Sequence, residues 1–226
     1  MFSQIFNDFG GWLIGLLYWL PGILIGFVFH EFAHAFVADK LGDPTPRMTG
    51  RLTLNPIAHI DPVGFLMLIV VHFGWAKPVM TNPSMYKKCR RHGFTLVSVA
   101  GVTMNFLLGF LFMFVTLLLL QHNIIESGSA WDNILENAAS INFILMAFNL
   151  IPIPPLDGYN ILKDLLLIKY FKSQTLWSIE RYGQFVLLAL VFFGGTSMII
   201  GTVSDFFQNI GIDVYNFIFN TSFYLA

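Results

Sequence analysis

The chain has 226 residues, of which 56% are hydrophobic and only 11% are charged, whereas about 25% of the residues in a soluble domain carry a charge. The formal net charge is −1, and no long basic tract indicates binding to nucleic acid. The single cysteine, Cys89, excludes an internal disulfide bond. The composition therefore predicts an all-α polytopic membrane protein that forms one structural unit.

Four apolar segments reach the length of about 20 residues that a helix needs to cross a bilayer. The first predicted helix runs from about Trp12 to Ala38 and the second from about Phe94 to Leu120. The third runs from about Ile134 to Ile153, where a cluster of prolines ends it, and the fourth from about Phe185 to Val203. We therefore expect about four transmembrane helices.

Two further segments are predicted from weaker patterns. The apolar run from Val63 to Phe73 is too short to cross the bilayer and is followed by the motif GWAKPV, so residues 63–83 are predicted to form a short re-entrant or β-containing segment. From Asp205 onward, polar residues recur at helical spacing among Phe, Ile and Tyr residues. This spacing predicts an amphipathic C-terminal helix that lies on the membrane surface.

The basic residues alternate between the predicted connections. Eight of the 12 Lys and Arg residues lie in residues 39–93 and the other four in residues 163–182, whereas residues 121–133 and 205–226 contain none. Lys and Arg mark the cytoplasmic loops of membrane proteins. We therefore expect a multi-pass protein with both termini outside and both basic connections in the cytoplasm.

The first apolar segment contains the stretch FHEFAHAF, in which Glu31 is the only charged residue between Phe9 and Val37. His30 and His34 are four residues apart and so share one face of a helix, with Glu31 beside them. This HExxH pattern is typical of a helix whose two histidines bind zinc while the glutamate acts on water. The alternative is structural, with both histidines bonded to neighbouring helices and a protonated glutamate between them.

Asp157 is a candidate for a third metal ligand. No Lys or Arg occurs in residues 1–39 or 92–162, so a metal ion would supply the positive charge that ionisable groups at membrane depth need. Asp157 and His34 each lie six residues before a lysine, which places both at a similar depth near the predicted cytoplasmic boundary. The pair Asp157-Gly158 also fits an ordinary turn at the membrane surface, and this alternative stays open.

Four motifs together resemble the site-2 protease family of intramembrane zinc metalloproteases, and in particular its short bacterial branch without PDZ or CBS domains. They are FHEFAHAF, GRLTLNPIAHIDPVG, GWAKPV and NLIPIPPLDG, and the resemblance extends from about residue 22 to residue 162. It implies that His30, His34 and Asp157 bind one Zn²⁺ ion. It also implies that Glu31 is the general base.

Asn105 lies in the motif AGVTMN and matches a membrane-embedded asparagine that the family places near the substrate backbone. The resemblance therefore implies a catalytic contribution from Asn105. The usual proline of this motif is replaced by Val102 here. An asparagine in a long apolar helix also fits an interhelical hydrogen bond, so both interpretations stay open.

The resemblance further implies one membrane-embedded metalloprotease domain over residues 1–226. Its catalytic core would cover about residues 12–170, with the fourth span and the amphipathic tail in about residues 181–226. The implied location is the bacterial inner membrane, with the active site towards the cytoplasmic side. The implied reaction is hydrolysis of peptide bonds in or near the transmembrane segment of substrates in the lipid bilayer, such as single-pass membrane proteins or signal-peptide-like remnants.

Two other functions compete with proteolysis. Intramembrane His and Asp residues also mark ion pathways, so a divalent-metal transporter is the main alternative. Transporters usually contain inverted repeats, and this sequence shows no such repeat. A catalytically silent membrane scaffold would not need an intact HExxH motif together with LDG. No nucleic-acid partner is expected, and the sequence does not indicate an oligomeric state.

Overall fold

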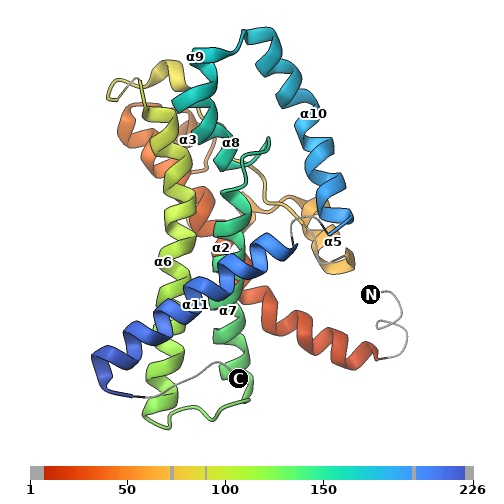
Figure 1. The fold of residues 1–226 in the computed structure, drawn as a ribbon, viewed down its shortest axis with the longest axis vertical. Helices are drawn as coiled ribbons and strands as arrows, with labels where there is room; N and C mark the ends of the chain where they lie inside the picture. Colours follow the sequence, from red (N-terminus) through yellow and green to blue (C-terminus); the bar gives the residue numbers. More distant parts are fainter. Residues whose placement is uncertain (1–7, 72–73, 90, 195–196, 222–226) are drawn as a thin grey trace.

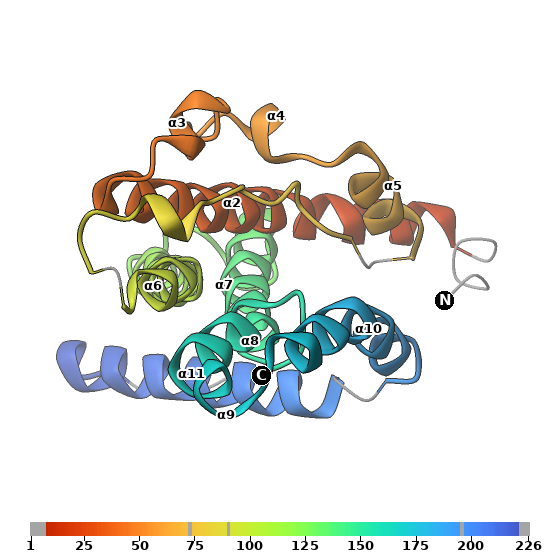
Figure 2. The same ribbon diagram turned by 90° about the horizontal axis from the view of Figure 1, so that it is seen from above.

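The protein is helical (Figure 1), and the computed structural model describes residues 8–71, 74–89, 91–194 and 197–221. Three long helices form its centre: α2 (Phe9–Leu41), α6 (Gly93–Gln121) and α7 (Ala130–Asn149). Each of the three packs against the other two. Seen from above, α2 forms a layer of its own that crosses α6 and α7 (Figure 2).

Two helices of the described part, α2 and α6, are long and apolar enough to cross a membrane. They coincide with the first and second predicted spans. Helix α7 occupies the position of the third, but polar residues such as Asp132, Glu136 and Asn142 interrupt its apolar sequence. The larger number of spans stays a prediction.

The fourth predicted span is wrong as a continuous helix. Helix α10 (Ser173–Phe192) ends inside the predicted range, and α11 (Ser197–Phe219) begins beyond a break. Gly194 follows the end of α10 with a φ of 74°, a left-handed conformation that glycine adopts without strain and that ends helices. Hydropathy did not reveal the break because the short sequence GGTS, residues 194–197, lies between two apolar runs and lowers the average over a window of about 20 residues only slightly.

The C-terminal tail is helical as part of α11, and one side of this helix packs on the protein. Ile212 and Tyr215 join Met113, Leu117 and Phe143 of α6 and α7 in one hydrophobic cluster. One part of the apolar surface that suggested a surface-bound helix is therefore buried within the protein, whereas Phe206, Val214 and Phe217 stay exposed. The position of α11 relative to a membrane stays a prediction.

The connection between α2 and α6, residues 42–92, lies along one side of α2 (Figure 2). Within the described residues it holds four short helical elements: α3 (Thr45–Met48), α4 (Pro56–His59), α5 (Pro62–Val71) and the 3₁₀ turn η1 (Pro83–Met85). One isolated antiparallel bridge pairs Ile60 with Ala76. The predicted re-entrant or β-containing segment, residues 63–83, thus combines a short helix with an extended stretch.

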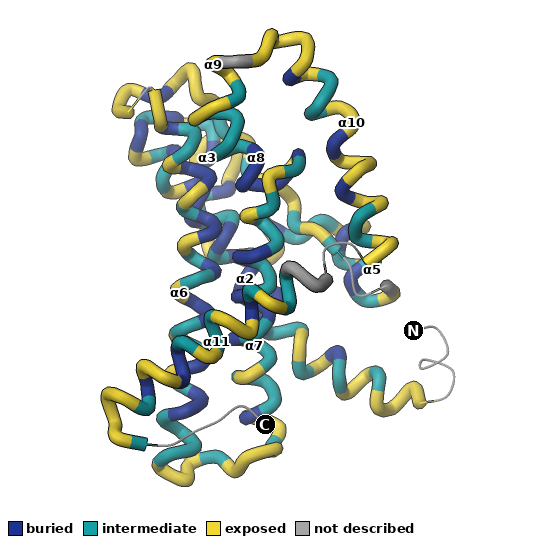
Figure 3. Tube along the Cα trace, in the orientation of Figure 1, coloured by how far each residue is buried: buried dark blue, intermediate teal, exposed yellow. Residues whose placement is uncertain are grey.

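After α7 the chain passes through a proline-containing turn into α8 (Asp157–Leu162), the π turn η2 (Lys163–Leu167) and α9 (Ile168–Tyr170). At the start of α6, Thr95 donates hydrogen bonds from its backbone N at 3.2 Å and its Oγ1 at 2.5 Å to Oδ2 of Asp164. These bonds hold η2 against α6. Buried residues concentrate on the central helices, whereas α10 is largely exposed (Figure 3).

Candidate metal centre

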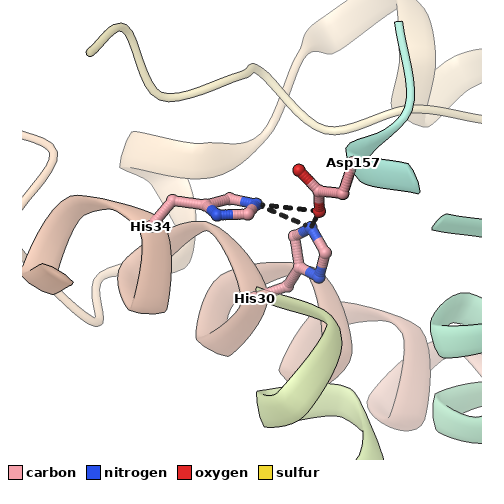
Figure 4. A group of neighbouring side chains, drawn as sticks. All are labelled: His30, His34 and Asp157. Atoms are coloured by element: carbon pink, nitrogen blue, oxygen red, sulfur yellow. Dashed lines mark hydrogen bonds and ion pairs between the residues drawn. The ribbon is translucent and has the colours of Figure 1, made fainter. Parts of the chain in front are cut away.

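Two histidines and one aspartate converge inside the protein (Figure 4). His30 and His34 lie on adjacent turns of α2, and Asp157 is the first residue of α8. The Nε2 atoms of the two histidines are 2.9 Å apart, and each lies 3.2 Å from Oδ2 of Asp157. All three residues are buried. Their three potential ligand atoms therefore face one point.

The spacing of these atoms suits a zinc ion. Ligand atoms that lie about 2.0–2.2 Å from a tetrahedral zinc ion are separated from one another by about 3.3–3.6 Å. The observed separations of 2.9 to 3.2 Å are close to this range. Oδ2 of Asp157 is buried and, among the described residues, its polar contacts are the two histidine Nε2 atoms at 3.2 Å. A buried carboxylate oxygen of this kind needs a cation, so the residues fit the metal.

Each imidazole is oriented by a hydrogen bond at its other nitrogen. Nδ1 of His34 lies 2.7 Å from the carbonyl oxygen of Val97, which can only accept, so Nδ1 carries the proton and donates it. Nδ1 of His30 lies 2.6 Å from Oδ1 of Asn105. A proton on each Nδ1 leaves the lone pair of Nε2 directed at Asp157. This is the tautomer that binds a metal.

A glycine of α6 provides the space for both rings. A Cβ atom at Gly101 would lie 2.5 Å from Cε1 and 2.6 Å from Nε2 of His34, and 2.7 Å from Cε1 of His30. Side-chain atoms do not approach one another this closely, so any other residue at this position would displace the imidazoles. The backbone of α6 therefore forms one wall of the site.

Asp157 reaches the histidines because the chain reverses after α7. This helix ends at Asn149, and the prolines that follow cannot continue it. Gly158 permits the tight approach of α8 to the end of α7, since a Cβ atom there would lie 2.2 Å from the carbonyl oxygen of Leu150. Asp157 and Gly158 begin α8 and are both buried, which does not fit the alternative of an ordinary surface turn, and the Asp157 side chain faces the histidines.

Glu31 lies beside the histidines on α2 and is partly buried. Its Oε2 accepts a hydrogen bond from the backbone N–H of Val79 at 2.8 Å. Glu31 is not a member of the convergent group formed by His30, His34 and Asp157. Its carboxylate is instead held by the extended stretch of the α2–α6 connection. A carboxylate next to a zinc site can accept a proton from water and release it again.

Residues 117–194 match the family model described as peptidase family M50. YwhC of Bacillus subtilis, assigned as a zinc metalloprotease, is 42% identical to the chain over 172 residues, which cover 74% of this chain and 77% of YwhC. The chain belongs to peptidase family M50. Rip2 of Mycobacterium tuberculosis strain H37Rv, also assigned as a zinc metalloprotease, is 32% identical over 180 residues, covering 76% of this M50 chain and 64% of Rip2.

A more distant relative carries the same description. The zinc metalloprotease MJ0392 of Methanocaldococcus jannaschii is 25% identical to this M50 chain over 176 residues, which cover 78% of the chain and 42% of MJ0392. The M50 chain thus spans less than two thirds of the length of Rip2 and MJ0392. No solved structure shows significant similarity to it.

These comparisons confirm the predicted resemblance to the site-2 proteases. The M50 chain is a zinc metalloprotease, and the group formed by His30, His34 and Asp157 is a set of residues that suits its zinc ion. Family membership, together with the two apolar helices α2 and α6, indicates a membrane protein. The roles of the individual residues rest on the geometry described above and are proposals.

Asn105 of the M50 chain lies behind His30 rather than at the ligand atoms. It is fully buried. Its Oδ1 faces Nδ1 of His30, and its Nδ2 donates to Oδ1 of Asn142 at 2.9 Å and to the carbonyl oxygen of Gly26 at 3.3 Å. The side-chain oxygen and nitrogen of Asn105 both have hydrogen-bond partners. This favours the interpretation that Asn105 forms hydrogen bonds between helices.

Two residues of the site were not singled out in the sequence. Gly101 contacts both imidazoles from α6, and Asn142 of α7 bonds to Asn105. A glycine within an apolar helix is common, and it carries no signal that identifies the residue it faces. The polar character of Asn142 within a predicted apolar span was a usable signal, since buried amides in membrane helices need partners.

Proposed function

We propose that this zinc metalloprotease is an intramembrane endopeptidase that hydrolyses peptide bonds in or near the transmembrane segment of membrane-anchored proteins. One observation carries the proposal: the metal-binding histidines and Glu31 belong to α2, one of the two helices of the described part that are apolar enough to cross a membrane. Ionisable residues in such helices are costly and mark functional sites. A peptide bond cut there must itself lie at membrane depth.

In this proposal His30 and His34 hold zinc through Nε2, and Asp157 holds it through Oδ2. Three protein ligands are typical of catalytic zinc, in contrast to the four of structural sites. When bound, zinc supplies a Lewis acid that polarises a carbonyl group and makes water more acidic.

Glu31 is the proton carrier of the proposed reaction. It takes a proton from the water that attacks the scissile carbonyl and then donates it to the nitrogen of the leaving peptide. Because the Val79 N–H occupies Oε2, the other carboxylate oxygen, Oε1, is the atom available for this transfer. The transporter alternative instead requires Glu31 as a ligand, whereas its Oε2 faces Val79.

A helical substrate must be unwound before it is cut, and we propose that it pairs as a strand with the extended stretch of residues 74–82. Lys77 donates its backbone N–H to the carbonyl oxygen of His59, and Val79 donates its backbone N–H to Glu31. The backbone N–H groups of Lys77 and Val79 therefore point to the same edge of this extended stretch. Successive residues of an extended chain direct their backbone groups to opposite edges. The edge that carries Ala76 and Met80 is therefore available to a second strand.

The strand proposal is tested by replacing residues 77–79 with Gly-Ser-Gly, which keeps a backbone N–H at position 79. Cleavage of a membrane peptide should fall while zinc content stays at the wild-type level. Unchanged cleavage by this variant would contradict pairing with residues 74–82.

We further propose a bacterial inner-membrane location with both termini outside and the active site towards the cytoplasm. The alternation of basic residues supports this orientation. Cys89 is the single cysteine of the chain, is exposed, and lies in a connection that would be cytoplasmic. A membrane-impermeant maleimide should label it in permeabilised cells and not in intact spheroplasts, and labelling of intact spheroplasts would reverse the orientation.

The function itself is tested with a fluorescent single-pass polypeptide reconstituted with the purified enzyme in liposomes. The wild type should cut it in or close to its 20-residue apolar segment, with the position identified by mass spectrometry. The Glu31→Gln variant, which keeps the ligand set, should not cut it. Cleavage confined to the soluble flanks of the polypeptide would contradict the intramembrane proposal.

A further inference from the structure

A continuous line of hydrogen bonds connects the proposed zinc ligand His30 to the backbone of α7. Nδ1 of His30 lies 2.6 Å from Oδ1 of Asn105, and Nδ2 of Asn105 donates to Oδ1 of Asn142 at 2.9 Å. Nδ2 of Asn142 in turn donates to the carbonyl oxygen of Ala138 at 2.8 Å. Both asparagines are 0% exposed. The line crosses from α2 through α6 to α7.

The direction of every bond in this line is set by carbonyl groups that can only accept. The carbonyl of Ala138 requires the NH₂ group of Asn142, so Oδ1 of Asn142 faces Asn105. The carbonyl of Gly26 and this Oδ1 both require the NH₂ group of Asn105, so Oδ1 of Asn105 faces His30. His30 must therefore donate from Nδ1, which leaves Nε2 free to bind a metal.

The local structure of α2 explains why His30 uses this longer route. His34 bonds directly to a backbone carbonyl of α6, that of Val97, whereas His30 meets the side chain of Asn105. Gly26, one helical turn before His30, leaves room for the two amides, because a Cβ atom there would lie 3.0 Å from Oδ1 of Asn142. Asn142 thus supplies the shorter of the two hydrogen bonds that set which end of Asn105 faces His30.

We propose that Asn142 is a positioning residue for the zinc site and that it acts through Asn105 to hold His30 in the metal-binding tautomer. This inference rests on the proposed role of His30 as a zinc ligand. Without Asn142, the amide of Asn105 loses the shorter of its two acceptors and keeps only the 3.3 Å bond to the carbonyl of Gly26, so its NH₂ group can turn towards His30 in a larger fraction of molecules. His30 would then carry its proton on Nε2, the atom that faces Asp157.

The first test measures zinc affinity by competition with a chromophoric chelator on the purified full chain. Asn142→Leu should raise the zinc Kd by about 10- to 100-fold, the range for residues that orient metal ligands. The matched control is Asn137→Leu, because Asn137 lies on the same helix and makes the same bond to the carbonyl four residues earlier, at 2.6 Å. The control should bind zinc within about twofold of the wild type.

A double variant separates action through Asn105 from a general loosening of helix packing. If Asn142 acts through Asn105, the zinc Kd of Asn105→Leu combined with Asn142→Leu should lie within about twofold of that of Asn105→Leu alone. Multiplication of the two single effects would overturn the proposal, as would a wild-type Kd in Asn142→Leu. In the same assay, His30→Ala tests the ligand assignment itself, and a wild-type Kd in His30→Ala would contradict the proposed function instead.

A measurement on the wild type keeps the proposal testable if the leucine variants do not fold. Nitrogen-15 NMR of histidine-labelled, zinc-free protein distinguishes the two tautomers, and the signal of His30 is assigned by its loss in His30→Ala. The proposal predicts a proton on Nδ1 of His30. A proton on Nε2 would overturn it.

Discussion

The backbone N–H of Val79 donates a hydrogen bond of 2.8 Å to Oε2 of Glu31, a residue 48 positions earlier in the chain. The bond ties the extended stretch of the α2–α6 connection to the proposed catalytic carboxylate. It uses one oxygen of Glu31 and leaves the other for proton transfer. A backbone N–H group is suited to holding the Glu31 carboxylate in place, because its position is set by the chain rather than by a rotatable side chain.

Removal of the Val79 backbone N–H should impair peptide hydrolysis without loss of zinc. Val79→Pro deletes the N–H but suits the extended conformation of the preceding residue, which is already a proline. A hydrogen bond to a charged group contributes about 1.5–3 kcal/mol, so the rate of peptide hydrolysis should fall by at least about tenfold. Val79→Ala keeps the N–H and should retain activity. Equal loss of activity in both variants would show that the side chain, not the hydrogen bond, matters.

Zinc content distinguishes ligands from the proton carrier. Elemental analysis of the purified protein should find about one zinc ion per chain in the wild type and in Glu31→Gln, and much less in Asp157→Ala. The reason is that Asp157 contributes Oδ2 to the convergent group whereas Glu31 does not. Loss of zinc in Glu31→Gln would identify Glu31 as a ligand and favour the transporter.

Gly101→Ala should weaken zinc binding. The added methyl carbon would lie 2.5 to 2.7 Å from atoms of both imidazoles, which must then leave the positions in which their Nε2 atoms meet Asp157. Gly109→Ala is a matched control on the same helix, since its methyl carbon would lie 2.7 Å from the ring of Phe143, and the three nearest atoms all belong to that ring rather than to a histidine. Both substitutions should lower the melting temperature, but only Gly101→Ala should raise the zinc Kd, by about tenfold or more.

Removal of zinc should destabilise the protein. The three proposed ligand atoms lie within 3.2 Å of one another and come from two helices, so a bound metal would link α2 to α8. A ligand at 100 times its Kd stabilises the folded state by about 2.7 kcal/mol. The melting temperature should therefore fall on chelation and recover when zinc is restored. Asp157→Ala should show no such response, and a response of wild-type size would place the metal elsewhere.

The sequence by itself determined the parts of this protein that depend on local spacing. The apolar runs that became α2 and α6 are visible because hydropathy accumulates over consecutive residues. The common face of His30 and His34 follows from the 3.6-residue period of a helix, so two of the three proposed ligands were visible within five residues. The sequence motifs also indicated the resemblance to the site-2 proteases, which the comparison with peptidase family M50 confirms.

The tertiary structure decided every relationship between distant residues. Sequence suggested Asp157 as a ligand by depth alone, but its contact with the histidines depends on how α7 packs on α2 and how the chain reverses at Gly158. The contact of Val79 with Glu31 and the line from His30 to Asn142 likewise join separate segments. The end of α10 is followed by a left-handed backbone conformation at Gly194. Such contacts arise from packing between segments, and no periodicity within one segment encodes them.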